Sequence, residues 1–547
     1  MCSAWRVQIL ALVAVRCLGV SSQTSNDVIV MTRKGPIAGL RVHNPKTGAS
    51  YDAFLGIPYG KTPKRFQLAV PPDPWTPLLK TQTDGPTCPQ GDRSVTEDCL
   101  YLNVFTPVGT STNKSSKLSV MVFVHGGAFK SGSSTSLIFG PDFLVSKDVI
   151  LVAMNYRLGA LGFATLGTKK APGNLGLTDI LLSLRWVQDE IAAFGGDPTS
   201  VTLFGQSAGA ILTQQLYLSR QTKGLFVGAI SQSGTAANEL GHVTKKEGER
   251  RTKVLAKHLG CDVTLDDSQV LKCLQQANVS DILARQNNIN LPLKDLVAGS
   301  NGLTFLPVLD CYQTADRPIF DDSLDTLIAQ AASRGRPLMD GWNTEEGVVK
   351  FQLDDYWKQA EANLDYFIPR KRQNSASNTT KAALAEAIRQ RFFPHTPDLN
   401  KVVSLVKLYT EKLFICPSIK TSRKLSNITY GYIYSFHGGW SIPRNKFPYP
   451  IITVAHGDEL PYLFYTALVN QPMDTCSVNR PNLQVNADMV RWWTTFAKTG
   501  SPGPDWMPLS EGKYRKIDSP ISTKDVQEVE EEHYKFCEAI EQCQSLT

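Results

Sequence analysis

The chain has 547 residues, of which 42% are hydrophobic and 20% are charged, and its formal net charge is +7 at pH 7. This composition is typical of a globular protein with a large core and excludes a disordered or fibrous chain. The basic residues are spread along the chain and form no run with interleaved aromatic residues, so we expect no nucleic-acid partner.

The N-terminal residues have the pattern of a secretory signal peptide. Arg6 precedes a short apolar core over residues 7–15, Arg16 shortens that core, and small residues follow it. So short a core cannot span a bilayer, which disfavours a membrane anchor, and no later segment is long and apolar enough to do so. We expect residues 1–22 to be a signal peptide, cleaved within residues 19–23, and residues 23–547 to form one secreted, extracellular domain.

Cysteines and sequons agree with this route. Nine cysteines lie outside the signal segment, and most should pair in an oxidising compartment, although the odd number leaves at least one free or intermolecular. No CxxC pair or histidine cluster accompanies them, so we expect no metal site, and no cofactor is expected either. Four asparagines lie in N-x-[ST] sequons and are candidate glycan sites: Asn113, Asn278, Asn378 and Asn427.

The first part of the chain is predicted to form strands. Residues 27–33 and 37–42 flank a Lys-Gly-Pro turn, which indicates a hairpin. Residues 61–97 are rich in proline and polar residues and predict a loop, and a strand is expected at residues 99–105. Two continuous apolar runs are typical of strands buried on both faces: residues 118–124 and 149–156.

Helices then alternate with further strands. Apolar residues recur at helical spacing over residues 178–194, and a Gly-Gly-Asp-Pro sequence ends that helix. The later segments predict strands at 201–204, 229–233, 337–342 and 429–436, interrupted helices at 240–335 and 350–425 with a polar break at 370–380, and an amphipathic helix at 484–499. The alternation predicts an α/β fold, with a mostly parallel central sheet covered by helices on both faces. One catalytic domain with helical insertions is the simplest division, because the chain has no internal repeat or low-complexity linker.

A G-x-S-x-G sequence, Gly205-Gln206-Ser207-Ala208-Gly209, lies between an apolar, β-prone run at 201–204 and a helix-compatible run at 208–218. A strand that turns sharply into a helix at a serine is a nucleophile elbow. Small residues are needed there because a side chain at Gly205 or Gly209 would collide with the neighbouring strand or helix. The alternative is a serine in a glycine-rich loop, since the pentapeptide alone often arises by chance.

A serine hydroxyl needs a base to take its proton, and in this arrangement the order along the chain is serine, acid, histidine. Six of the eight histidines follow Ser207, and His456 alone follows an apolar strand, at 451–454, in a loop with a glycine. Any single histidine is otherwise an ordinary surface or core imidazole. The acid is expected just after the strand at 337–342, where Glu345 and Glu346 are both candidates that spacing does not separate.

Backbone N–H groups for an oxyanion hole are expected at two places. One is the N–H of Ala208, directly after the serine. The others belong to the loop His125-Gly126-Gly127-Ala128, where glycines let the backbone approach a substrate closely.

Further motifs occur in order along the chain: Phe54-Leu55-Gly56-Ile57-Pro58-Tyr59, Glu97-Asp98-Cys99-Leu100-Tyr101-Leu102-Asn103-Val104, Asn155-Tyr156-Arg157-Leu158-Gly159, Gly173-Asn174-Leu175-Gly176-Leu177-Thr178-Asp179, Phe194-Gly195-Gly196-Asp197-Pro198 and Gln232-Ser233-Gly234. With the elbow and His456, this series resembles the type-B carboxylesterase and cholinesterase family of α/β-hydrolases, from about residue 28 to 540. Its elbow and the sequence after His456 are similar to those of arthropod carboxylesterases, including juvenile hormone esterases.

The resemblance implies a catalytic triad of Ser207 as nucleophile, Glu346 as acid and His456 as base. It places the oxyanion hole on the N–H groups of Gly127, Ala128 and Ala208. It also implies two salt bridges, Arg65–Glu97 and Arg157–Asp179, and three disulfides, Cys88–Cys99, Cys261–Cys273 and, as in cholinesterase-like members, Cys416–Cys537. The pairing of Cys311, Cys476 and Cys543 is left open.

Some positions depart from the family pattern. Ala128 replaces a glycine but keeps its N–H, and Ile180 replaces a glutamine without a clear consequence. Gln206 replaces a glutamate, which removes a negative charge beside the nucleophile. The loop between Cys88 and Cys99 has no aromatic residue, whereas cholinesterases hold a choline-binding tryptophan there. These departures argue against acetylcholine and favour neutral esters.

The sequence therefore predicts a secreted serine carboxylesterase that hydrolyses small neutral esters through an acyl-enzyme. A juvenile-hormone-type ester hydrolase is the alternative, and a cholinesterase or a catalytically silent adhesion homologue is disfavoured. The ester substrate is the expected partner. Substrate identity and oligomeric state stay open, although Cys543 could link chains.

Overall fold

The computed structural model describes residues 27–542 apart from 92–94, 114, 116, 301–302, 310–317, 354–355, 374, 395–397, 442–453, 467–468, 471–479, 512, 519–524 and 527. The predicted signal peptide, most of the strand predicted at 451–454, and Cys311, Cys476 and Cys543 lie outside the described residues. The described part contains no helix that is both long and apolar enough to cross a membrane.

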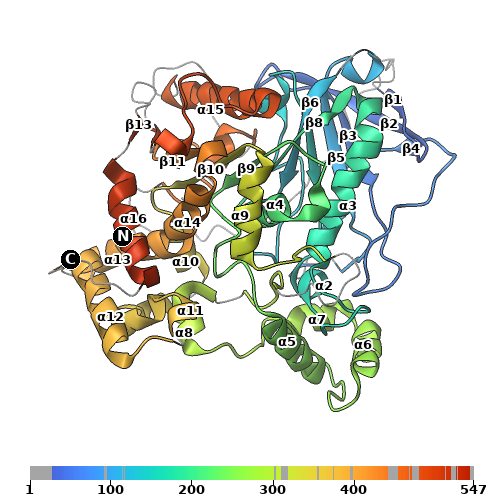
Figure 1. Ribbon diagram of the computed structural model, residues 1–547. Coiled ribbons are helices and arrows are strands. Elements are labelled where there is room, and N and C mark those ends of the chain that lie inside the picture. The colour runs from blue at the N-terminus through green and yellow to red at the C-terminus, as the bar shows by residue number, and fades with distance from the viewer. Residues whose placement is uncertain are drawn as a thin grey trace, which may run out of the picture.

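One mixed sheet runs through the described part of the chain, with strands in the order β1-β2-β3-β5-β7-β6-β8-β9-β10-β11-β12-β13, and β4 beside β2 (Figure 1). The strands are β1 Asp27–Met31, β2 Pro36–His43, β3 Ser50–Pro58, β4 Leu79–Lys80, β5 Tyr101–Pro107, β6 Leu118–Val124, β7 Ile150–Met154, β8 Gly196–Gln206, β9 Gly228–Gln232, β10 Leu338–Asn343, β11 Thr429–Tyr434, β12 Tyr514–Ile517 and β13 Asp525–Val526. The strands from β7 to β12 pair in parallel, and antiparallel pairs form both edges.

Helices and short turns fill the connections. The α-helices are α1 Asp142–Val145, α2 Gly159–Phe163, α3 Leu175–Glu190, α4 Ala208–Leu218, α5 Lys245–His258, α6 Asp267–Gln276, α7 Val279–Arg285, α8 Leu293–Asp295, α9 Leu324–Arg334, α10 Val348–Leu353, α11 Arg370–Gln373, α12 Asn378–Phe392, α13 Asp398–Thr410, α14 Cys416–Lys424, α15 Arg480–Thr499 and α16 Glu528–Gln542. Two π-helical turns, η4 Leu296–Ser300 and η7 Glu411–Ile415, interrupt this pattern.

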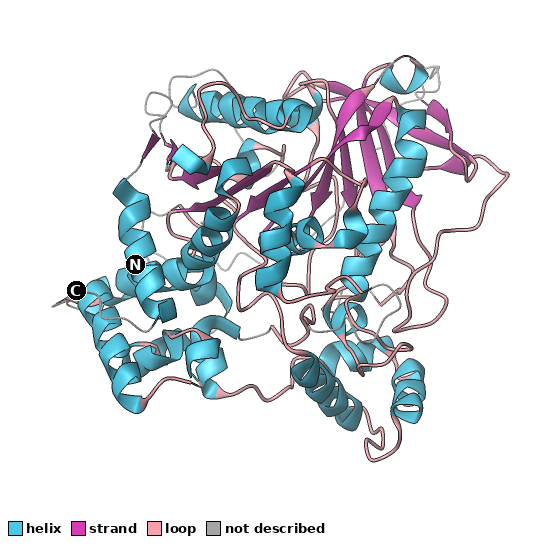
Figure 2. Ribbon diagram, in the orientation of Figure 1, coloured by secondary structure: helices cyan, strands magenta, loops and turns pink. Residues whose placement is uncertain are grey.

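The sheet separates two hydrophobic cores, because successive side chains of a strand point to opposite faces. Val122 of β6 belongs to the core that includes residues of α3 and α4, whereas its neighbour Phe123 belongs to the core that includes residues of α15. Helices thus cover both faces of the sheet (Figure 2). The continuous apolar sequence of β6 is the direct consequence, since both of its faces are buried.

The helical insertions gather at one end of the molecule. Helices α5–α7 follow β9 and helices α10–α14 follow β10, and Figure 1 shows α5–α7 and α12 below the sheet. The arrowheads of the central strands point toward this end (Figure 2). Residues that follow the parallel strands therefore face the insertions, which is where ligands bind in open α/β sheets.

The predicted elements agree with the structure, with local differences. The loop predicted at 61–97 contains the short strand β4, and the polar break at 370–380 is narrower than expected because α11 covers residues 370–373. The sequence patterns did not predict β12 and β13, which are short strands, or α16, a helix that is polar on one side.

Three disulfides join the pairs that the resemblance implied: Cys88–Cys99, Cys261–Cys273 and Cys416–Cys537. The two implied salt bridges are also present, with N–O distances of 2.6 Å for Arg65–Glu97 and 2.7 Å for Arg157–Asp179. All four sequon asparagines, Asn113, Asn278, Asn378 and Asn427, are exposed, so each is accessible to a glycan.

Candidate active site

Ser207 lies at a strained turn between β8 and α4. Its backbone angles are φ 59° and ψ −126°, and its N–H donates to Gln232 O at 2.8 Å, which ties the turn to β9. A Cβ added to Gly209 would lie 2.1 Å from Val124 O, and one added to Gly205 would lie 2.5 Å from Gly209 O. The two glycines are thus required by the close approach of backbone to backbone, as the elbow interpretation predicts.

His456 contacts Glu346 and not Glu345. The distance from His456 Nδ1 to Glu346 Oε2 is 2.5 Å, and Glu346 Oε1 accepts from the Asn343 N–H at 2.7 Å. Glu345 instead accepts from the Val454 N–H at 2.9 Å. The structure thus separates two adjacent carboxylates that spacing along the chain could not.

Several carboxylates set the charge of the His456 side chain, which is 12% exposed. Burial opposes its protonation, but the charges of Glu346, Glu459 and Asp458, with the hydrogen bond that the ring donates to Glu346, raise its pKa above the ordinary value. Burial, followed by the negative charge of Glu346, raises the pKa of Glu459 to about 7. Glu459 Oε2 accepts from Asn343 Nδ2 at 2.7 Å. Sequence reasoning missed Glu459, and its position three residues after His456 was the available signal.

The Nε2 atom of His456 is occupied by a glutamine. Gln206 Nε2 donates to His456 Nε2 over 3.2 Å, since the Nδ1 atom is the one that donates to Glu346. No hydrogen bond joins Ser207 Oγ to His456 among the described residues. Such bonds are often long in unliganded enzymes and tighten when substrate binds.

The glycine loop after β6 has an unusual backbone. Gly127, Ala128 and Phe129 have φ values of 115°, 55° and 61°, so two residues with side chains adopt a left-handed conformation. A Cβ at Gly127 would lie 2.0 Å from Ser131 O. The surrounding turn holds the backbone in this strained conformation. Such a conformation is expected of a loop that presents its N–H groups to a ligand.

His125 at the start of this loop is a structural residue. Its ring stacks on Tyr156 with centroids 4.4 Å apart, and its Nδ1 atom donates to Gly126 O at 2.8 Å. Burial lowers the pKa of His125 to about 4, so the ring stays neutral at physiological pH.

A cavity of about 90 Å³ brings the predicted residues together. Ser207, His456, Ala208 and Ala128 all line it, whereas Gly127 and Glu346 are not among the lining residues. Most of the remaining lining is apolar. Phe129 comes from the glycine loop and Ile211 from α4, whereas the insertions, which sequence reasoning did not place, contribute Leu240, Gly299, Leu303, Val349, Leu413 and Phe414. Among the described residues that line the cavity, Lys350, which is 1% exposed, is the one with a permanent charge.

The two π-helical turns form part of the cavity wall. Gly299 belongs to η4 and Leu413 and Phe414 belong to η7, and the Phe414 ring lies 5.1 Å from the His456 ring. Turns of this kind are rare and occur frequently at functional sites. A Cβ at Gly299 would lie 2.9 Å from Leu240 Cδ1, so the missing side chain lets Leu240 pack closely against this turn.

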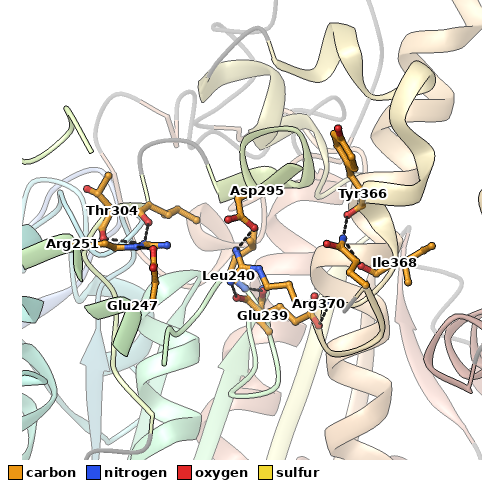
Figure 3. Close-up of polar contacts among 12 residues, drawn as sticks. Glu239, Leu240, Glu247, Arg251, Asp295, Thr304, Tyr366, Ile368 and Arg370 are labelled. Atoms are coloured by element: carbon orange, nitrogen blue, oxygen red, sulfur yellow. Dashed lines mark hydrogen bonds and ion pairs between the residues drawn. The ribbon is translucent and has the colours of Figure 1, made fainter. Parts of the chain in front are cut away.

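Hydrogen bonds and ion pairs join the segments that carry this wall (Figure 3). Glu239 accepts from the Arg370 N–H and from Lys412 Nζ, both at 3.0 Å, and the Arg370 guanidinium reaches Asp295 at 3.3 Å. Burial raises the pKa of Glu239, but the charges of Lys412 and Arg370 outweigh it and hold that pKa below its ordinary value. Arg251 donates to the carbonyls of residues 303 and 304, each at 3.0 Å. The segments around η4 and η7 are thus joined by charged groups.

The described residues offer one group with metal-ligating atoms close together: Glu411, Cys416 and Cys537. The two sulfurs are joined in a disulfide, and Glu411 also accepts a hydrogen bond from His533 Nδ1 at 2.7 Å. This group therefore does not fit a metal ion, because a disulfide sulfur is not a thiolate ligand.

A model of the carboxylesterase family matches residues 26–537. The chain belongs to the carboxylesterase family. A solved structure similar to this esterase is that of the juvenile hormone esterase from Manduca sexta with OTFP covalently attached. The two chains share 28% sequence identity with a TM-score of 0.82, over 94% of this chain and 100% of the other.

Proposed function

We propose that this carboxylesterase-family protein is a serine esterase that hydrolyses neutral carboxylic esters through an acyl-enzyme. Ser207 is the nucleophile, His456 the general base and Glu346 the acid that orients the imidazole. The observation that carries the proposal is the 2.5 Å contact between His456 Nδ1 and Glu346 Oε2, with the imidazole and Ser207 on one cavity. A carboxylate at Nδ1 keeps the proton of the neutral imidazole there, so the lone pair that takes the serine proton lies on Nε2.

In the proposed reaction, the Nε2 atom of His456 removes the Ser207 proton as Oγ attacks the ester carbonyl carbon. The N–H groups of Gly127, Ala128 and Ala208 stabilise the negative charge on the carbonyl oxygen. The C–O bond to the alcohol then breaks, and the alcohol leaves with the proton from Nε2. Water hydrolyses the acyl-enzyme by the same steps, which releases the acid and restores Ser207.

The preference for neutral esters rests on the charges at the cavity. No carboxylate is among the described residues that line it, and Gln206 is uncharged where the family pattern has glutamate. The loop from Cys88 to Cys99 contains no aromatic ring that could attract a quaternary ammonium. A cationic ester thus gains little attraction here, whereas an apolar acyl or alcohol group fits the lining.

A juvenile-hormone-type ester is the second candidate substrate. The similarity to the Manduca sexta enzyme and the apolar wall favour it. Rates on a long terpenoid methyl ester and on short aryl esters, measured with the same preparation, separate the two. A kcat/KM at least ~100-fold higher for the terpenoid ester would favour the hormone-type hydrolase.

Secretion also belongs to the proposal. The N-terminal pattern, the three disulfides and the exposed sequons agree with an extracellular protein that is made as one domain, residues 23–547, after signal removal. Mass spectrometry of the protein from culture medium, before and after glycosidase treatment, tests the signal cleavage and the glycans at Asn113, Asn278, Asn378 and Asn427.

The decisive experiment is Ser207→Ala with a fluorophosphonate label. We expect the label to bind the wild-type protein but not the variant. The rate of p-nitrophenyl acetate hydrolysis should be about 10⁴-fold or more lower in the variant. A substrate panel that varies acyl and alcohol size separately then defines the specificity. Near-normal turnover by Ser207→Ala, with folding unchanged, would refute the mechanism.

A further inference from the structure

The carboxamide of Gln206 lies between the glycine loop and the base. Gln206 is 6% exposed, and its Nε2 atom lies 3.2 Å from His456 Nε2. A Cβ added to Gly126 would lie 2.8 Å from Gln206 Oε1, so the glycine at 126 leaves the space that the carboxamide fills. The side chain is therefore held by packing on one side and by the imidazole on the other.

The direction of this hydrogen bond follows from the opposite side of the ring. His456 Nδ1 donates to Glu346 Oε2 at 2.5 Å, so the neutral ring carries its lone pair on Nε2. Gln206 Nε2, an N–H donor, occupies that lone pair. The same lone pair must take the Ser207 proton in the proposed reaction.

We propose that Gln206 is a positioning residue that holds His456 as the neutral imidazole with its proton on Nδ1. The proposal rests on the function proposed above. The amide N–H can donate only to a deprotonated Nε2, whereas an imidazolium presents a second N–H to it. A carboxylate at this position would act in the opposite sense, because it accepts from the imidazolium and favours the charged ring.

The other groups around His456 show why such a contact matters. Glu346 lies on the Nδ1 side of the ring. Asp458 and Glu459 follow His456 in the same loop, and all three carboxylates favour the charged imidazole. The segment η7 contributes the uncharged ring of Phe414, and α10 contributes the cationic Lys350 to the same cavity. Among the described residues, Gln206 is the group that bonds Nε2 directly, and it opposes the three carboxylates.

The experiment measures the pH dependence of Ser207 reactivity in two variants. Gln206→Glu places a carboxylate at Nε2, and Gln206→Met removes the hydrogen bond and keeps a side chain of similar length. The control Gln330→Glu makes the same charge change on α9, where the side chain accepts from Arg220. The readout is the second-order rate constant for inactivation by diethyl p-nitrophenyl phosphate, an uncharged organophosphate, between pH 5 and pH 9.

We expect the midpoint of the acidic limb to rise by about one pH unit or more in Gln206→Glu, which is a loss of about tenfold below the limb. In Gln206→Met the midpoint should rise by about half a unit. Both variants should approach the wild-type rate on the alkaline plateau, and Gln330→Glu should match the wild type throughout. A merely structural role would lower the plateau without moving the midpoint.

Two failures are distinguishable. If the wild type is not inactivated, or Ser207→Ala is inactivated equally, the proposed function fails whatever Gln206 does. If inactivation depends on Ser207 but the limbs of Gln206→Glu and Gln206→Met coincide with the wild type, the role of Gln206 alone is overturned.

Discussion

The two sides of the cavity at Ser207 are built in different ways. On the elbow side, backbone packs on backbone at Gly205 and Gly209, and there is no room for one added carbon. On the opposite side, the wall consists of insertions and two π-helical turns, joined by the ion pairs of Glu239. We infer that close backbone packing positions the reacting groups, whereas the wall joined by ion pairs determines which substrates fit.

The largest expected effect is on the elbow side. Gly209→Ala places a Cβ 2.1 Å from Val124 O, a backbone atom of β6 that cannot move without shifting the sheet. We expect hydrolysis of p-nitrophenyl acetate to fall to background. Gly228→Ala is the matched control, because its Cβ would lie 3.4 Å from the nearest heavy atom. An active Gly209→Ala enzyme would contradict the view that close backbone packing on the elbow side is needed for the reaction.

The next effect concerns the acid. Glu346→Gln keeps the shape but cannot stabilise the imidazolium or enforce the tautomer of His456, so kcat should fall by about 10²–10⁴-fold. Glu345→Gln is the neighbouring control, since Glu345 accepts from the Val454 N–H rather than from the histidine. Steady-state kinetics on one aryl ester test this difference. An equal fall of kcat in both variants would contradict the assignment of Glu346 as the acid.

The pH dependence of kcat/KM reports on His456, the proposed base, which lies between the two sides and contacts Phe414 of the wall. His456 must be neutral to accept a proton, and its raised pKa places the midpoint of the kcat/KM profile above about 6.5. The rate should be full above this midpoint and fall about tenfold per pH unit below it. A flat profile down to pH ~4 would be inconsistent with a histidine base.

A smaller effect is expected where the wall is anchored. The Cys416–Cys537 disulfide follows η7 directly and ties it to α16, across 121 residues of sequence. Replacing both cysteines with alanine should lower the free energy of unfolding by about 2–4 kcal/mol, measured by urea denaturation. Hydrolysis at moderate temperature should persist. Loss of the reaction in a folded double variant would show that the wall also supports the chemistry.

The smallest effect is on selectivity. Glu239→Gln leaves Lys412 and Arg370 without their shared carboxylate, so the wall loosens. The ratio of kcat/KM for a bulky ester over an acetate ester should change by about tenfold or less, with the pH midpoint unmoved. Asp267→Asn, which removes the partner of Lys253 in an exposed pair on the same insertion, is the control. An unchanged ratio would argue against the wall as the selectivity element.

Prediction from the sequence succeeded where the pattern is local. Residues 208–218 were expected as a helix and form α4, and residues 118–124 were expected as a buried strand and form β6. The lining of the cavity was not predicted, because Leu240, Leu303 and Leu413 come from insertions with no periodic relation to one another. Spacing along the chain did not separate Glu345 from Glu346; the family resemblance implied Glu346, and the fold shows that Glu346 is the one in contact with His456.

The sequence by itself determined the α/β alternation, the membership in the esterase family and the steric demands of the elbow. Those properties depend on neighbours within a few residues, such as the glycines on either side of Ser207. Only the tertiary structure decided the contact of Gln206 with His456, the position of Glu459 and the bracing of the wall by Glu239. Each of these joins groups far apart in the chain, and their energies depend on burial and distance, which no local pattern encodes.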